Sequence, residues 1–115
     1  MLPAPGQGPS ESVRENGFFT AHFVATESAP PPGAKPRRSF VRIAARADPG
    51  YKGTSIMAAE AALCLALQAE QLPGATGGCL TPATCMGDAL VERLRARGFD
   101  VAARDFGDDE VAPDA

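Results

Sequence analysis

Few of the residues that build catalytic or metal sites occur in this chain of 115 residues. It has no tryptophan, one tyrosine, one histidine and three cysteines. The cysteines, Cys64, Cys79 and Cys85, contain no C-x-x-C pair and His22 is distant from them, so the ligand spacing of a zinc site is missing. No G-x-S-x-G segment presents a serine nucleophile. We therefore predict no metal site, no catalytic residue and three reduced thiols.

Basic residues are too few to predict nucleic-acid binding. The net charge is −3, and the five acids of residues 105–115 account for it, because the rest of the chain holds 11 bases and nine of the 14 acids. No Lys/Arg cluster is interleaved with aromatic residues along the sequence. We predict that nucleic acid is not a partner.

Long apolar runs are also missing. The longest, from Ile56 to Leu67, is interrupted by Glu60 and is shorter than the roughly 20 residues that a membrane span needs. The N-terminus lacks the basic and apolar regions of a secretory signal. These absences predict a cytoplasmic protein without a membrane partner.

The two ends of the chain differ in composition from its middle. The first 12 residues are rich in proline and glycine, and residues 105–115 are acidic without a base. Such segments bury too little apolar surface to offset the entropy of ordering. We predict a flexible N-terminal segment at 1–16, a folded α/β region at 17–104 and a disordered acidic tail at 105–115.

Two strands are expected first. Residues 17–26 are rich in aromatic and β-branched side chains, and residues 39–47 alternate between apolar and basic side chains. A proline-rich loop at 27–38 separates them. We predict that they pair as an antiparallel hairpin.

A helix that is apolar on all sides should follow. Asp48-Pro-Gly-Tyr51 is a turn signal, Thr54 or Ser55 is placed to cap a helix, and nearly every residue from there to Leu67 is apolar. A helix without a polar face is buried on every side. About 90 folded residues offer little material to surround it, so this helix predicts a partner.

The second half predicts another helix and a final strand. Thr81-Pro82 has the pattern of an N-cap and first helical residue, and the helix should end before Gly98. Residues 99–104 alternate as a strand does. The fold class is α+β or mixed α/β, with an antiparallel strand pair, two helices and a final strand.

Only two side chains stand out chemically. Glu60, inside the apolar helix, is either a buried acid with a raised pKa or, as we favour, the partner of a cation or backbone group. Tyr51 either lines a substrate pocket, where it could donate a proton, or packs as a lid over the core. The sequence leaves both roles of Tyr51 open, and it is the one candidate substrate-binding residue.

Three groups of residues, in this order, resemble the C-terminal portion of saccharopine dehydrogenase-like oxidoreductases, in particular the bacterial trans-acting enoyl reductases. They cover most of residues 8–101. The groups are Gly8-Pro-Ser10 with Arg14, Gly17 and Phe18; Asp48-Pro-Gly-Tyr51 with Thr54, Met57, Glu60 and Ala62–Ala66; and Leu80–Ala83 with Met86–Leu90, Arg93-Leu94 and Gly98-Phe99.

The resemblance implies an NAD(P)H-dependent enzyme that reduces enoyl groups on chains built by polyketide synthases. It implies an N-terminal Rossmann domain and a second α/β domain for substrate and dimer contacts. No G-x-G-x-x-G opens a helix here, so the chain alone is expected to bind no cofactor and to be an inactive C-terminal fragment. Its expected partner is the missing Rossmann half or a separate subunit. The alternative is a non-catalytic binding or assembly module that pairs with another chain or forms a homodimer.

Overall fold

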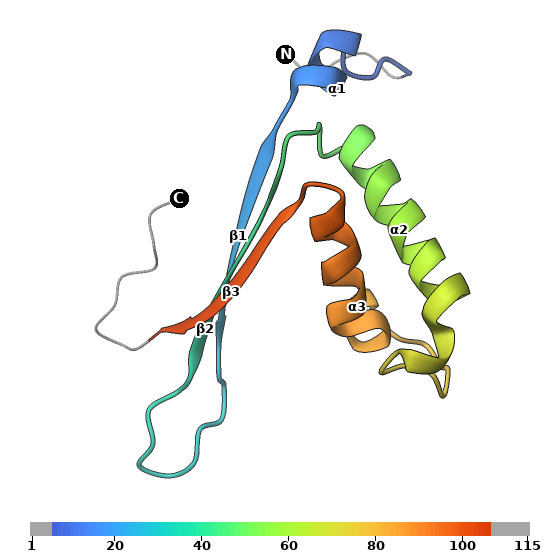
Figure 1. Cartoon of the computed structure of the whole chain (residues 1–115). Helices are drawn as coiled ribbons and strands as arrows, with labels where there is room; N and C mark the ends of the chain where they lie inside the picture. The colour runs from blue at the N-terminus through green and yellow to red at the C-terminus, as the bar shows by residue number, and fades with distance from the viewer. Residues whose placement is uncertain (1–5, 107–115) are drawn as a thin grey trace.

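The computed structural model describes residues 6–106 as a three-stranded antiparallel sheet with two long helices beside it (Figure 1). The elements are α1 (Glu11–Asn16), β1 (Phe19–Thr26), β2 (Arg38–Ala45), α2 (Lys52–Gln68), η1 (Ala69–Gln71), α3 (Pro82–Ala96) and β3 (Asp100–Phe106). This composition confirms the predicted α+β class. All strand pairs of the described residues are antiparallel, so this part of the chain holds no parallel β-α-β unit of a Rossmann domain.

The predicted hairpin is confirmed, and β3 extends it. β1 pairs with β2 over its whole length, from Phe19 opposite Ala45 to Thr26 opposite Arg38. β3 lies on the other side of β2, with Phe106 opposite Arg38. β2 is therefore the central strand of the sheet. Its neighbour β1 precedes the two helices in the sequence, and its other neighbour β3 follows them.

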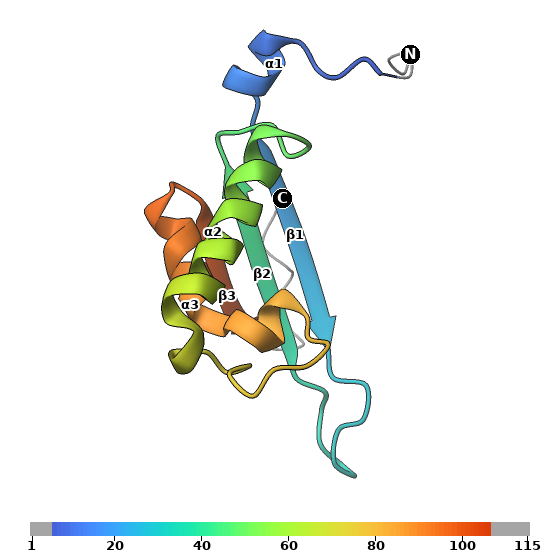
Figure 2. The ribbon, with the colours of Figure 1, turned by 90° about the vertical axis from the view of Figure 1, so that its right-hand side faces the viewer.

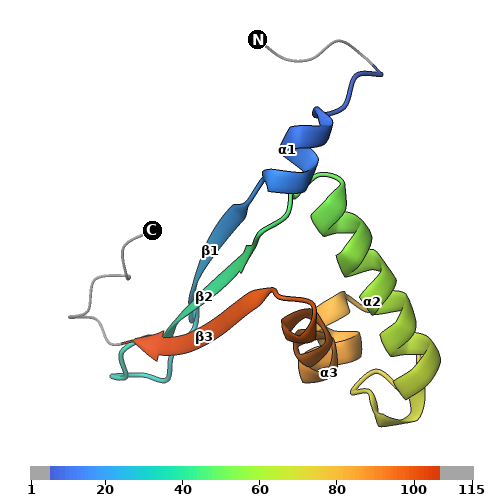
Figure 3. The ribbon, with the colours of Figure 1, turned by 45° about the horizontal axis from the view of Figure 1, so that its top comes forward.

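One face of the sheet looks toward the helices, which lie on the same side of it in Figures 1 and 3. Phe19 belongs to this face. The ring centroid of Phe19 lies 6.2 Å from that of Phe99 in an edge-on arrangement. A β-carbon on Gly53 of α2 would lie 3.6 Å from the Phe19 ring. Because side chains alternate along a strand, Ala21 and Phe23 share this face.

The opposite face is called here the open face. It consists of the even-numbered residues of β1 (20–26), β2 (38–44) and β3 (100–106), because directly opposed residues of an antiparallel pair point the same way. Figure 2, seen from the helix side, shows α2 and α3 in front of the sheet and the open face turned away.

The core lies between the helices. Cys64 on α2, Leu72 after η1 and Met86 on α3 are buried together, and Leu90 packs against them. Thr81 caps α3 as predicted, since its hydroxyl accepts a hydrogen bond from the N–H of Thr84. The predicted helix is not continuous, however.

A kink divides α3 at Gly87, whose φ of 51° is left-handed. A β-carbon there would lie 3.2 Å from the ring of Pro73. Glycine at this position thus permits both the kink and the close approach of the preceding loop.

The prediction for the start of α2 was wrong. The helix begins at Lys52, before Thr54 and Ser55, whose hydroxyls instead donate to the carbonyls of Pro49 (2.6 Å) and Lys52 (2.9 Å). Asp48 does the capping, because its carboxylate accepts the N–H groups that open the helix.

The boundaries of the folded part also differ from those predicted. Within the segment 1–16, residues 11–16 form α1, whose first turn is capped by the hydroxyl of Ser10 accepting from the N–H of Val13. β3 continues through Asp105 and Phe106, two residues into the predicted tail. Residues 1–5 and 107–115 lie outside the described residues, and the flexibility of both ends stays a prediction.

The chain does not bury α2 on all sides. Leu63, Leu65 and Leu67 have exposed fractions of 39%, 46% and 69%. The radius of gyration is 17.5 Å, whereas a compact domain of about 100 residues has about 13 Å. No helix in residues 6–106 is long and apolar enough to cross a membrane. Much of the apolar surface of α2 is therefore left uncovered by the described residues.

Candidate functional site

The turn that starts α2 is held by Asp48, which is buried. Its carboxylate accepts hydrogen bonds from the N–H groups of Gly50 (3.1 Å), Tyr51 (2.9 Å) and Lys52 (3.0 Å). Donation from the Lys52 N–H, followed by the other two and the nearby Arg14, holds the pKa of Asp48 below its ordinary value although burial opposes this. Asp48 is therefore a charged anchor for the loop and not a proton donor.

Tyr51 projects from this turn and is 57% exposed. A β-carbon on Gly8 would lie 3.3 Å from its hydroxyl oxygen, so the ring stands against the N-terminal segment. Tyr51 does not line the pocket described below. Its role in substrate binding stays a prediction.

Glu60 ties α2 to α3. Its carboxylate accepts a 2.6 Å hydrogen bond from Nε of Arg97 and lies 2.8 Å from a terminal nitrogen of Arg93. The side chain is 5% exposed. The hydrogen bond from Arg97 and the charge of Arg93 keep the pKa of Glu60 below its ordinary value, against the effect of burial. The favoured prediction of a cation partner is confirmed, and Glu60 is a structural anion.

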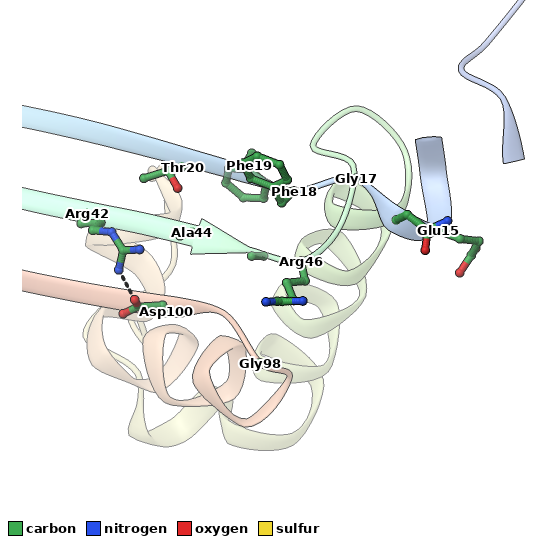
Figure 4. Close-up of a pocket in the computed structure, with 12 residues that line it drawn as sticks. Glu15, Gly17, Phe18, Phe19, Thr20, Arg42, Ala44, Arg46, Gly98 and Asp100 are labelled. Carbon is green, nitrogen blue, oxygen red and sulfur yellow. Dashed lines mark hydrogen bonds and ion pairs between the residues drawn. The ribbon is translucent and has the colours of Figure 1, made fainter. Parts of the chain in front are cut away.

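A pocket of about 580 Å³ opens at the end of the sheet near α1 (Figure 4). Its walls come from the α1–β1 connection, the start of β1, the end of β2 and the α3–β3 turn. The lining residues are Glu15, Asn16, Gly17, Phe18, Phe19, Thr20, Arg42, Ala44, Ala45, Arg46, Gly98 and Asp100. Of its polar residues, Thr20, Arg42 and Asp100 lie on the open face, and Arg46 directly follows β2.

The charges of the pocket are only partly matched. Arg42 forms an ion pair with Asp100 across two strands, and Glu15 pairs with Lys52 at the rim. Arg46 is exposed, and Figure 4 draws no interaction between its guanidinium and the other pocket residues. The pocket therefore offers one cation to an incoming anion.

The pocket lacks a proton-transfer pair. None of its lining residues is a histidine, cysteine, tyrosine or lysine, and its carboxylates face basic side chains. Binding an anionic or acidic group is the chemistry that this arrangement supports. Sequence reasoning missed the pocket, although the basic residues at every fourth position from Arg38 to Arg46 were a usable sign.

The glycine-rich segment 74–78 does not have the setting of a dinucleotide-binding loop. It follows η1 and not a strand. A β-carbon on Gly74 would meet Leu80 at 2.7 Å and the Cα of Cys85 at 2.9 Å, so this glycine makes room for the chain itself. Gly77, where a β-carbon would meet nothing within 4 Å, serves the turn through its positive φ.

The three cysteines are free thiols in separate settings. Cys64 is buried, Cys85 is half-buried and Cys79 is exposed. Across residues 6–106 no group of three His, Cys, Asp or Glu side chains is arranged to hold a metal ion.

Comparison with known proteins supplies the functional context. The chain is 44% identical over 101 residues, 88% of its length, to a protein assigned as a trans-acting enoyl reductase in Mycobacterium tuberculosis. Trans-acting enoyl reductases of Mycobacterium bovis and Mycobacterium ulcerans are 38% and 37% identical over 85% and 90% of this chain. The chain is a homologue of one part of the trans-acting enoyl reductases. No protein-family model and no solved structure matches it.

The match covers only a small part of each relative. The chain spans about a fifth of the length of these enoyl reductases, 22% to 23%. This similarity confirms the predicted resemblance to enoyl reductases at its coarser level. It also means that the activity of the whole relatives cannot be read directly onto these 115 residues.

Proposed function

We propose that this chain forms the part of a saccharopine dehydrogenase-like, NAD(P)H-dependent enoyl reductase that lies outside the nucleotide-binding domain. On its own it binds no cofactor and is inactive. The observation that carries the proposal is the 44% identity over 101 residues that amount to only 22% of the relative. The absence of a dinucleotide cradle from residues 6–106 supports it.

The exposed side of α2 supports the same proposal. Burying a leucine side chain fully contributes about 1.5–3 kcal/mol, and Leu63, Leu65 and Leu67 leave much of that unrealised. We propose that the rest of a complete reductase, about four times as long as this chain, covers these leucines. We propose that such a cofactor-binding part is the partner of this chain, in a cytoplasmic protein.

The alternative is a non-catalytic assembly module that covers the same leucines by forming a homodimer. Light scattering separates the two proposals. A stable, soluble dimer with cooperative unfolding would favour the module, whereas a chain that binds hydrophobic dyes and aggregates would favour the incomplete reductase.

The proposal is tested first by titrating the isolated chain with NADPH and NADH while nicotinamide fluorescence is recorded. The mycobacterial relative provides the positive control. We expect no change for the chain up to millimolar cofactor. Saturable binding by the isolated chain would contradict the proposal.

A further inference from the structure

The open face and the pocket gather four arginines, three of which recur at every fourth position of one segment. Arg38 and Arg42 lie on β2 and share this face. Arg104 on β3 pairs with Phe40 on β2, and Arg46 directly follows β2 and lines the pocket. Residues four apart on a strand are separated by about 13 Å and neighbouring strands by about 5 Å, so Arg38, Arg42 and Arg46 form an extended row along β2 with Arg104 beside it on β3. Asp100 is the one carboxylate among the described residues of the open face.

Two of these arginines are committed to neighbours and two are available. The guanidinium of Arg38 lies 4.4 Å over the ring of Phe106, and Arg42 pairs with Asp100. Arg46 and Arg104 are exposed and form no ion pair among residues 6–106. An uncompensated cation on a surface attracts acidic groups over a distance of about 8 Å at physiological salt.

Apolar side chains accompany the patch. Phe18, which lines the pocket, is 77% exposed, and Val24 on the open face is 52% exposed. Exposed aromatic residues together with arginine are characteristic of the centres of protein interfaces. Phe40 and Phe106 on this face are only 7% and 6% exposed, and the half-buried ring of His22 lies 5.3 Å from that of Phe40, so little ring surface is available for stacking nucleic-acid bases.

We propose that the open face is a docking surface for the acidic surface of another protein. Phe18 contacts an apolar side chain of the partner, Arg46 in the pocket receives one carboxylate, and Arg104 receives another. The arginines flanking Phe40 fix the register of the partner on the sheet. This docking surface is on the side of the sheet away from α2 and does not depend on the proposed reductase function.

The test measures fluorescence anisotropy of a labelled helical peptide, titrated with the full chain at low salt. The peptide carries four glutamates at i, i+4 spacing beside leucines, and a second peptide has lysine in place of each glutamate. The variants are Arg46→Glu with Arg104→Glu, the conservative Arg46→Lys with Arg104→Lys, and a matched control, Arg37→Glu with Arg95→Glu, which makes the same charge change away from the face. Circular dichroism confirms that each variant keeps its helices.

We expect the glutamate peptide to bind, to weaken with salt, and to lose at least about tenfold in affinity with the double glutamate variant. The lysine variant and the control should stay within about twofold to threefold. Absence of binding at millimolar chain, or equal loss in the control, would overturn the proposal. Tighter binding of a thymidine 15-mer than of the peptide would overturn it as well, because the face would then recognise nucleic acid.

Discussion

Glu60 on α2 accepts a 2.6 Å hydrogen bond from Nε of Arg97, the residue that follows α3, so its carboxylate joins α2 to the end of α3. Arg93 adds a second cation to the same carboxylate. A carboxylate with two guanidinium partners can stay ionised while it is shielded from water. This pairing explains how an acid is accommodated inside an otherwise apolar helix.

Replacing Glu60 with glutamine should loosen the packing of α2 on α3. The variant keeps the shape of the side chain but leaves Arg93 beside a neutral group in a half-buried position, where an unpaired charge is costly. We expect a lower urea midpoint in the far-ultraviolet circular dichroism signal. Glu92→Gln, at an exposed position of α3, is the matched control, and an equal shift in both variants would contradict the structural role of Glu60.

Stability should decline in acid because two carboxyl groups have lowered pKa values in the folded chain. The pKa of Asp48 and that of Glu60 lie below their ordinary values of 3.8 and 4.5, so the unfolded chain takes up protons first. Their stabilisation is present above about pH 4.5 and is lost as the pH falls through the folded pKa values. The urea midpoint should fall between neutral pH and pH 4 by a smaller amount in an Asp48→Asn, Glu60→Gln double variant than in the unmodified chain. An equal fall in both would show that these two carboxyl groups do not cause the loss of stability in acid.

Alanine at Gly53 should destabilise the start of α2. Its β-carbon would lie 2.9 Å from the carbonyl oxygen of Asp48, which now accepts a 2.7 Å hydrogen bond from the Gly53 N–H. We expect a loss of about 1–3 kcal/mol, although the same change in an open helix gains about 1 kcal/mol. Ala58→Gly at an exposed position of α2 calibrates that gain in unfolding experiments, and a more stable Gly53→Ala chain would show that the turn can relax.

Lysine at Leu63 and Leu67 should have opposite effects on the isolated chain and on a complete reductase. In the isolated chain the charges reduce exposed apolar surface, so dye binding and aggregation should fall. In a reductase that covers α2 they would be buried, so assembly and activity should be lost. Lysine at Thr54 and Ser55 is the control, and loss of assembly with both pairs would indicate that any charge on α2 is harmful.

Local signals predicted the elements well. Aromatic and β-branched residues predicted the first strand of the hairpin, alternation predicted the second, and Thr81-Pro82 marked the start of α3. The predicted cap of α2 was wrong because serine caps a helix about as well as aspartate does, and only the conformation of the turn decides that Asp48 reaches the free N–H groups. α1 was not predicted, because this helix of six residues is short and begins at the Ser10 cap directly after a proline-rich segment.

Relations between distant residues could not be predicted. The partners of Glu60 lie 33 and 37 positions further along the chain, and only the packing of α2 on α3 brings them together. The basic patch arises because β2 aligns its arginines on one face and β3 adds Arg104 from beyond both helices. The regular spacing of Arg38, Arg42 and Arg46 pointed to one side of this patch, but the addition of Arg104 depends on the pairing of β2 with β3.

The decisive measurement is enoyl reduction by a chimera in which this chain replaces the matching fifth of the mycobacterial relative. Consumption of NADPH is followed with an enoyl thioester, beside the unmodified relative and the isolated chain. We predict that the chimera retains at least about a tenth of the parental kcat/KM and that the isolated chain is inactive. A chimera that folds and binds NADPH but reduces nothing, or an isolated chain that turns over substrate, would contradict the proposed function.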